Sequence, residues 1–296
     1  MQMFRIGDYT VTRIEEQREP GFAPAALFEE FDEAVFAEEP LLASPEMFHG
    51  ASGVLISSIH TWLVRGEGHV ILIDTGCGNA KERPDPRFQG RFHMLNLPFL
   101  ERLESAGVRA EDVTHVLNTH LHIDHVGWNT KGSGAHWTPT FPKARYVMGG
   151  LELAYWLESA TVARGGDQTR SIDDSVRPVL RAGLVDTVKP GDAIVPGLTV
   201  EAAPGHTIGH LAFRLSSLGE AALFTGDVMH HAMQVVRPRW NSRFCIDQDA
   251  ARKTRARILD DAAEQQIILF PSHFGVPHGI RVRREGSSYR PVIVSA

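Results

Sequence analysis

Three histidines and an aspartate fall within six residues of this 296-residue chain, at His120, His122, Asp124 and His125. Imidazole nitrogens and carboxylate oxygens together form a ligand set for zinc or a similar divalent ion, and the scarcity of cysteine disfavours a structural zinc site. The whole chain contains 15 histidines, so this clustering needs a chemical reason. The pattern predicts a catalytic metal site.

The spacing of these residues favours two metals. We expect a strand from Val113 to His120 that leads into Leu121 and His122. Residues two apart on an extended backbone point to the same side, so His120 and His122 can bind one metal while Leu121 faces the core. A turn near Asp124 would let Asp124 and His125 serve a second metal.

Three later segments each place a candidate ligand after an apolar strand. They are APGHTIGH at 203–210, LFTGD at 223–227 and LFPSH at 269–273. Glycine or proline in each segment allows a tight backbone turn beside the ligand. These segments offer His206, Asp227 and His273, and the two oxygens of Asp227 can each bind one cation.

Together with IDTG at 73–76, the motifs HLHIDH (120–125), GHTIGH (205–210), TGD (225–227) and PSH (271–273) resemble the metallo-β-lactamase superfamily. The resemblance implies an α/β fold of the αββα type, in which two facing mixed sheets carry helices on their outer sides. The sequence has no linker that would separate domains, so we expect one domain over residues 1–296, with an acidic N-terminal arm at about 15–50.

The resemblance also implies a role for each candidate residue. The first metal would be held by His120, His122 and His206, the second by Asp124, His125 and His273, and Asp227 would bridge the two. Asp74 would orient a metal-bound histidine, because such a histidine usually donates its other N–H to a carboxylate or carbonyl. His210 is a candidate for a similar supporting role, and ordinary structural hydrogen bonding is the alternative for both residues.

The carboxyl-terminal half is similar to the methyl parathion hydrolase group, which includes lactone, aryl-ester and phosphotriester hydrolases. The matching stretches are TFPKARY (140–146), 196–210 and 272–292. The most active β-lactamases place a cysteine where Asp227 stands, which disfavours antibiotic hydrolysis. Quorum-quenching lactonases place a tyrosine three residues after the bridging aspartate, and His230 takes that position here.

We therefore expect a dinuclear metal-dependent hydrolase that attacks a lactone or carboxylic ester with a metal-bridging hydroxide. Asp124 would return a proton to the leaving alkoxide, and His230 would donate an extra hydrogen bond. Two zinc ions are the expected cofactors, with iron, manganese or cobalt as alternatives. Phosphotriester and thioester hydrolysis remain alternative reactions. A di-iron redox protein and a non-catalytic scaffold are alternatives from other classes, disfavoured by His122 and by the complete ligand set.

Apolar residues that follow the ligand motifs are candidates for a substrate pocket. Trp128, Met229 and Phe274 would line an entrance suited to a small uncharged ester or lactone. Ordinary core packing is the alternative for each of them.

The pattern of apolar residues predicts the elements that position these motifs. Strands are expected at Tyr9–Ile14, Val54–Val64, Val70–Asp74, Val113–Asn118, Arg145–Met148, Leu198–Ala202, Leu211–Leu215, Ala221–Thr225 and Ile267–Phe270. Helices are expected at Pro98–Ala106, Gly149–Ala160, Ile172–Ala182 and Asp249–Gln265, and an exposed loop at Lys131–Pro142.

Composition excludes several classes of partner. The 30 Lys and Arg against 36 Asp and Glu give a net charge of −6 without a basic run, which disfavours nucleic acid. No stretch has the roughly 18 apolar residues that span a bilayer, and the first residues lack a signal-peptide pattern, so we expect a cytoplasmic protein. Two cysteines, Cys77 and Cys245, are too few for a disulfide framework.

Residues 15–46 contain ten acidic residues and one arginine, with Leu27, Phe28, Phe31 and Val35 at helical spacing. A surface helix, a lid and a contact in a homodimer are the three interpretations of this segment.

Overall fold

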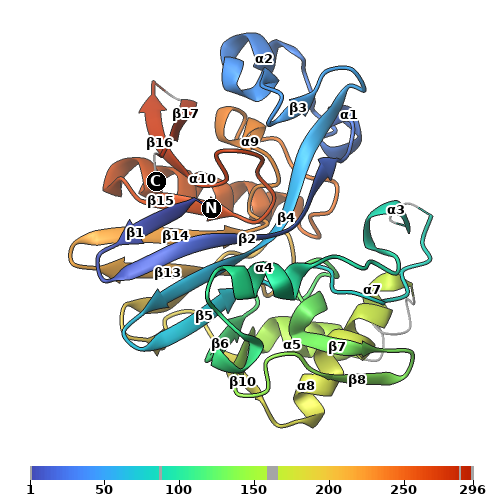
Figure 1. Cartoon of the computed structure of the whole chain (residues 1–296). Helices are drawn as coiled ribbons and strands as arrows, with labels where there is room; N and C mark the ends of the chain where they lie inside the picture. Colours follow the sequence, from blue (N-terminus) through green and yellow to red (C-terminus); the bar gives the residue numbers. More distant parts are fainter. Residues whose placement is uncertain (1, 87–88, 159–165, 287, 295–296) are drawn as a thin grey trace. The chain divides into compact units, whose positions relative to one another are not determined.

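Short runs of aliphatic and β-branched residues form strands throughout the computed structural model, which describes residues 2–86, 89–158, 166–286 and 288–294 (Figure 1). The chain folds into two compact units. The first contains Met1–Gln17 and Ile59–Asp192, and the second contains Arg18–Ser58 and Ala193–Ala296. Each unit is therefore built from two separate stretches of chain.

A mixed sheet forms the centre of the first unit. Its strand order in the described residues is β1-β2-β4-β5-β6-β9-β10. The pairs β5–β6, β6–β9 and β9–β10 are parallel, and β4–β5 is antiparallel. Ile71, Leu72 and Ile73 of β5 are all buried, as expected for a parallel strand covered on both faces. The strands are β1 (Met3–Ile6), β2 (Tyr9–Pro20), β4 (Val54–Gly66), β5 (His69–Ile73), β6 (His115–Leu117), β9 (Arg145–Gly149) and β10 (Val185–Val188).

Helices supply apolar side chains to the core of the first unit. Phe99 and Leu103 of α4 and Leu153 of α5 join the same buried cluster as Leu72 and Val116. The helical segments are α3 (Gln89–Phe92), α4 (Phe99–Ser105), η2 (Ala110–Asp112), η3 (Gly127–Asn129), α5 (Gly150–Leu157), α7 (Asp167–Ser171), the π-helical η4 (Ile172–Val176) and α8 (Arg177–Arg181). A hairpin of β7 (Thr130–Ser133) and β8 (His136–Pro139) completes the described elements of this unit.

The second unit contains another mixed sheet, with strands β11 to β17 in sequence order. The β14–β15 pair is parallel, and the other pairs between neighbouring strands in the described part of this sheet are antiparallel. The strands are β11 (Ala193–Val195), β12 (Leu198–Ala202), β13 (Leu211–Ser217), β14 (Glu220–Gly226), β15 (Ile268–Pro271), β16 (Ile280–Glu285) and β17 (Ser288–Ile293).

The long helix α10 (Gln248–Gln265) has residues at both ends that stabilise a helix terminus. The Asp247 side chain accepts the backbone N–H groups of Asp249 and Ala250, and Gln266 adopts a left-handed conformation after the last turn. The smaller elements of this unit are α1 (Pro24–Leu27), α2 (Ala34–Glu38), η1 (Pro40–Ala43), β3 (Phe48–His49) and α9 (Met233–Val236).

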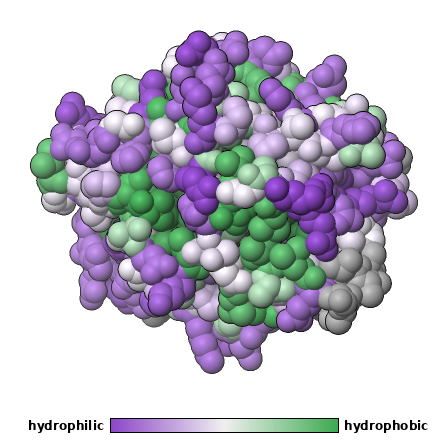
Figure 2. Space-filling view, turned by 90° about the horizontal axis from the view of Figure 1, so that it is seen from below, coloured by the Kyte–Doolittle hydropathy of each residue, from purple (hydrophilic) through white to green (hydrophobic). Residues whose placement is uncertain are grey.

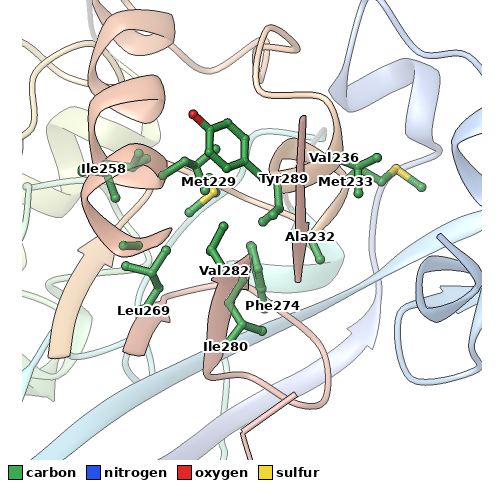
Figure 3. Close-up of a cluster of buried hydrophobic side chains, with 14 of the residues drawn as sticks. Met229, Ala232, Met233, Val236, Ile258, Leu269, Phe274, Ile280, Val282 and Tyr289 are labelled. Atoms are coloured by element: carbon green, nitrogen blue, oxygen red, sulfur yellow. The ribbon is translucent and has the colours of Figure 1, made fainter. Parts of the chain in front are cut away.

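One apolar cluster joins the two chain segments of the second unit. Leu27 and Phe28 near the amino terminus share it with Val282 and Tyr289 near the carboxyl terminus. Figure 3 shows the carboxyl-terminal part of this cluster, where Met229 and Phe274 lie among Leu269, Ile280 and Val282. Burial of these side chains stabilises the packing of the arm.

The predicted mixed α/β class with two sheets and helices is confirmed, and differences in the elements have local causes. The predicted surface helix over 15–46 is wrong, because β2 extends to Pro20 and only the short α1, α2 and η1 follow. The expected loop at Lys131–Pro142 forms the β7–β8 hairpin. Residues 159–160 of the helix predicted at Gly149–Ala160 lie outside the described residues.

Polar and apolar residues are interspersed on the face shown in Figure 2. Among the described residues, no helix is both long enough and apolar enough to cross a membrane.

Candidate metal centre

Four predicted ligands of the first unit lie together just after β6. The ring centroids of His120 and His122 are 4.6 Å apart, and those of His120 and His125 are 4.0 Å apart. The nearest oxygen of Asp124 lies 3.7 Å from Nε2 of His125. The strand ends at Leu117, close to the end expected at Asn118, but it does not continue to His120, so His120 and His122 converge from an irregular segment.

The backbone around these ligands follows the remaining expectations. Leu121 is 1% exposed and packs in the core of the first unit. A turn covers residues 123–125, and the His125 N–H donates to the His122 carbonyl. Asp124 and His125 therefore project from a turn, as predicted.

Asp74 fixes the orientation of His125. It follows β5 directly, and its Oδ2 lies 2.9 Å from Nδ1 of His125. Its Oδ1 accepts the Thr119 N–H at 2.8 Å, which ties the carboxylate to the ligand segment. A histidine held in this way through Nδ1 presents Nε2 to a metal. These are the contacts that the predicted ligand-orienting role requires.

Glu16 supports the loop that carries Asp74. This buried carboxylate accepts the backbone N–H groups of Cys77 and Gly78 and the indole N–H of Trp128, at 2.7, 2.9 and 2.6 Å. Burial raises the pKa of the Glu16 carboxyl, and the donated hydrogen bonds oppose that shift. Sequence reasoning did not single out Glu16, because nothing nearby distinguishes it from the other acidic residues of the arm.

Asp227 is the centre of the candidate ligands in the second unit. It follows β14, and its Oδ2 lies 3.3 Å from Nε2 of both His206 and His230. Nε2 of His273, which follows β15, lies 3.1 Å from the other oxygen, Oδ1. One donor atom each from His206, Asp227 and His230 fall within 4.8 Å of one another. The structure thus gathers the predicted residues His206, Asp227 and His273, and adds His230 to the possible ligands.

Hydrogen bonds hold these side chains in place. Nδ1 of His273 donates to the Ser58 carbonyl at 3.0 Å, so Nε2 is the nitrogen that faces Asp227. Nε2 of His210 accepts the backbone N–H of Asp227 at 3.1 Å. The backbone N–H of His230 donates to Oε1 of Gln234 at 2.7 Å. Gln234 is a supporting residue that sequence reasoning missed.

His231 differs from its neighbour His230. Its Nε2 donates to the Met47 carbonyl, and its Nδ1 accepts the Met233 N–H. Burial lowers the pKa of His231 to about 4, so the ring is neutral near pH 7. Both ring nitrogens are used within the fold, which gives His231 a structural role.

The three predicted pocket residues have packing contacts, and their role toward a substrate stays a prediction. Trp128 stacks on Phe99 with ring centroids 5.1 Å apart. Together with Asn79 and Leu97 it borders a cavity of about 330 Å³ in the first unit. Met229 and Phe274 are 0% exposed within the cluster of Figure 3.

The donor chemistry of each unit fits a divalent metal. The donor groups are imidazoles and carboxylates without cysteine, a set that suits zinc and similar ions. In both units a further hydrogen bond fixes the tautomer of a candidate ligand, at His125 by Asp74 and at His273 by Ser58.

Comparison with known proteins agrees with this chemistry. The family model described as Metallo-beta-lactamase superfamily matches residues 22–273. A probable metallo-hydrolase of Mycobacterium tuberculosis is 29% identical over 181 residues, which cover 58% of this chain and 57% of that protein. An acyl-coenzyme A thioesterase of Homo sapiens is 26% identical over 234 residues, which cover 77% of each chain. The chain thus spans little more than half the length of the mycobacterial relative.

Two solved structures show the same fold. The hydrolase AbOPH of the beta lactamase superfamily aligns with a TM-score of 0.81 and 24% identity, over 100% of this chain and 97% of that one. AidC, a dizinc quorum-quenching lactonase, aligns with a TM-score of 0.78 and 19% identity over the same shares. With two mixed sheets, HLHIDH at 120–125 and a family match over most of its length, this chain belongs to the metallo-β-lactamase superfamily.

Proposed function

We propose that this protein is a two-metal hydrolase that opens a small uncharged lactone or carboxylic ester. The observation that carries the proposal is the Asp227 carboxylate, whose oxygens lie 3.1–3.3 Å from the imidazoles of His206, His230 and His273. Several imidazoles around one carboxylate form a strong ligand set for divalent cations. The aspartate in place of cysteine supports a hydrolase other than a β-lactamase.

We distribute the candidate ligands between two cations as the resemblance to the superfamily implies. His120, His122 and His206 would hold one, and Asp124, His125 and His273 would hold the other, with Asp227 shared. Bound divalent cations supply a nucleophile from water at neutral pH and polarise the substrate carbonyl. Zinc is the proposed metal, which the donor set and the similarity to a dizinc lactonase both support.

The residues of the chain then have separate tasks. The Asp124 carboxylate would accept a proton from the attacking water and return it to the leaving alkoxide, which completes the alcohol as the ring or ester bond breaks. His230 would donate a hydrogen bond to the carbonyl oxygen as negative charge develops there. Asp74 would keep the His125 ring fixed throughout, because its hydrogen bond to Nδ1 does not involve the substrate.

Thioester hydrolysis is the second candidate, and the names of the matched relatives favour it. These include the human acyl-coenzyme A thioesterase and a hydroxyacylglutathione hydrolase of Methylococcus capsulatus, which is 31% identical over 163 residues. A thioester carbonyl needs the same attack and the same oxyanion stabilisation as an ester. Only the leaving group differs.

The test compares kcat/KM for an acyl lactone, an aryl ester, an acyl thioester and an aryl phosphotriester. Zinc-reconstituted protein is measured beside protein stripped by a chelator. We expect the highest value for the lactone or ester, and its loss on stripping. A higher value for the thioester or phosphotriester would reassign the substrate, and activity that survives complete metal removal would contradict the mechanism.

Asp227→Asn tests the ligand assignment in the same assays. We expect it to lose bound metal and turnover together, because the amide carries no charge to balance the cations. Asp249→Asn, at a side chain 83% exposed, is the matched control. Undiminished turnover in Asp227→Asn would contradict the assignment.

A further inference from the structure

The peptide groups of Leu121, the residue between His120 and His122, are held by two side chains from other elements. The Leu121 N–H donates to Oε1 of Glu152 at 3.2 Å. The Leu121 carbonyl accepts Nε2 of Gln168 at 2.6 Å. Because this segment has no strand or helix pairing of its own, these two bonds satisfy its backbone inside the core.

Glu152 is itself firmly placed. It lies on α5, is 1% exposed, and its Oε1 also accepts the indole N–H of Trp156 at 2.7 Å. The Trp156 ring then lies edge-on to the His122 ring, with centroids 5.7 Å apart. Glu152 and Trp156, one helical turn apart, therefore contact the ligand segment at Leu121 and at His122.

Gln168 is anchored from the other side. It lies on α7, where the preceding Asp167 side chain accepts the Asp85 N–H at 3.0 Å. In the π-helical turn that follows, Asp174 accepts Nζ of Lys81 at 3.3 Å and pairs with both terminal nitrogens of Arg83 at 2.7 and 2.9 Å. These buried ion pairs fix α7 and η4 to the segment that contains Lys81, Arg83 and Asp85.

We propose that Glu152 and Gln168 are positioning residues that clamp the Leu121 peptide and thereby set the angle between the His120 and His122 imidazoles. Neither residue is itself a ligand or a catalytic group in the proposed function, and the inference rests on that function in taking His120 and His122 as ligands. Supporting residues around metal ligands typically change metal affinity by about 10–100-fold when removed. We expect the loss of either Glu152 or Gln168 to weaken metal affinity by a similar factor.

The test uses Co²⁺ as the probe on metal-free full-length protein. Glu152→Ala and Gln168→Leu each remove one half of the clamp, and Glu152→Gln retains an oxygen that accepts the Leu121 N–H. Co²⁺ affinity is measured by competition with a chelator, and the ligand geometry by the visible absorption of the cobalt form. Thermal unfolding of the metal-free proteins reports on the fold alone.

We expect Glu152→Ala and Gln168→Leu to bind Co²⁺ about 10–100-fold more weakly and to change its visible spectrum. Glu152→Gln is expected to stay within about threefold of the unsubstituted protein, since it restores the acceptor. Glu158→Ala, which removes an exposed carboxylate at the end of the same helix, is the matched control and should change nothing.

Different results would contradict the proposed function and the clamp. If the unsubstituted protein binds no Co²⁺, both the proposed function and the clamp are wrong. If it binds Co²⁺ and the folded variants show the same affinity and spectrum, only the clamp is wrong. Should Glu152→Ala not fold, the decision passes to Gln168→Leu, whose side chain is half-buried at the start of a short helix.

Discussion

At the scale of single residues, His230 has two chemically distinct roles open to it. Its Nε2 lies 3.3 Å from the Asp227 carboxylate, close enough for a shared metal, while the proposed mechanism uses it as a hydrogen-bond donor. A ligand would be needed to retain metal, whereas a donor would be needed only for turnover. The two roles therefore separate experimentally.

We predict that His230→Ala lowers kcat by about 100-fold, because it removes one donor to the developing oxyanion. Bound metal, counted by elemental analysis, should not change. His49→Ala, at an exposed histidine of the same unit, is the control. Loss of metal from His230→Ala would instead identify His230 as a ligand.

Asp74 gives a second prediction at this scale. Asp74→Asn keeps the size of the side chain but removes the charge that faces Nδ1 of His125. We expect metal affinity to fall by about 10–100-fold, measured by chelator competition. The thermal midpoint of the metal-free variant controls for folding, and unchanged affinity in a folded variant would exclude the orienting role.

At the scale of elements, the loop after β5 and the ligand segment are packed against each other without space for a methyl group. A Cβ on Gly127 would lie 1.9 Å from the Cys77 carbonyl carbon and 2.4 Å from the Gly78 nitrogen. These are backbone atoms, so the contact cannot be relieved by a side-chain rotation. The glycine thus sets the distance between the loop that carries Asp74 and the segment that carries His125.

Gly127→Ala is accordingly expected to destabilise the protein by about 1–3 kcal/mol, as overpacking does in well-packed interiors. Urea unfolding measures the effect. Gly50→Ala, where a Cβ would meet nothing within 4 Å, provides the comparison. Equal stability of the two variants would show that the loop adjusts freely.

Elements with a strong local signal could be predicted from the sequence. The apolar run of β5 and the spaced apolar face of α10 lie within one or two residues of the expected positions. β10, β16 and β17 were missed for two reasons. VDTV of β10 forms a strand by pairing with β9, which is distant in sequence. The arginine-rich IRVRRE of β16 pairs with the adjacent β17, but its composition is not typical of a strand. The hairpin at Thr130–Ser133 and His136–Pro139 was missed because its strands TKGS and HWTP contain lysine, glycine and proline, which are depleted in strands.

In the candidate site too, residues with a local sequence pattern could be predicted and residues without one could not. Motif spacing identified the residues that the structure gathers around Asp227 and after β6. It could not identify Glu16, Glu152 or Gln168, since their partners lie between 31 and 112 positions away in the chain. A lone acidic or amide residue carries no local pattern that distinguishes a buried support from a solvated surface group.

At the scale of the whole molecule, a buried cation makes stability depend on pH. Burial lowers the pKa of Lys81 to about 8 from its ordinary value of 10.5, while Asp174 opposes the shift. Between these two pH values the unfolded chain binds more protons than the folded protein, so the Lys81 contribution to stability rises with pH. Below pH 8 Lys81 is protonated in both the folded and the unfolded state, so its contribution to stability no longer depends on pH.

We predict that the free energy of unfolding of the unsubstituted protein, minus that of Lys81→Met, rises between pH 8 and 10.5. One proton corresponds to a slope of at most about 1.4 kcal/mol per pH unit. Urea unfolding at four values from pH 7 to 10 measures the difference, which cancels the titration of all other groups. A flat difference would show that Lys81 titrates alike in both states.

The apolar cluster of the second unit combines side chains from two chain segments that are far apart in sequence, which also affects how the protein folds during synthesis. Leu27, Phe28 and Val35 leave the ribosome more than 200 residues before their partners Val282 and Tyr289. At about 5–20 residues per second, the nascent arm waits for tens of seconds with its apolar side chains exposed. Ten acidic residues at 15–46 lie among those side chains in the sequence, and their like charges oppose association between copies of the exposed segment.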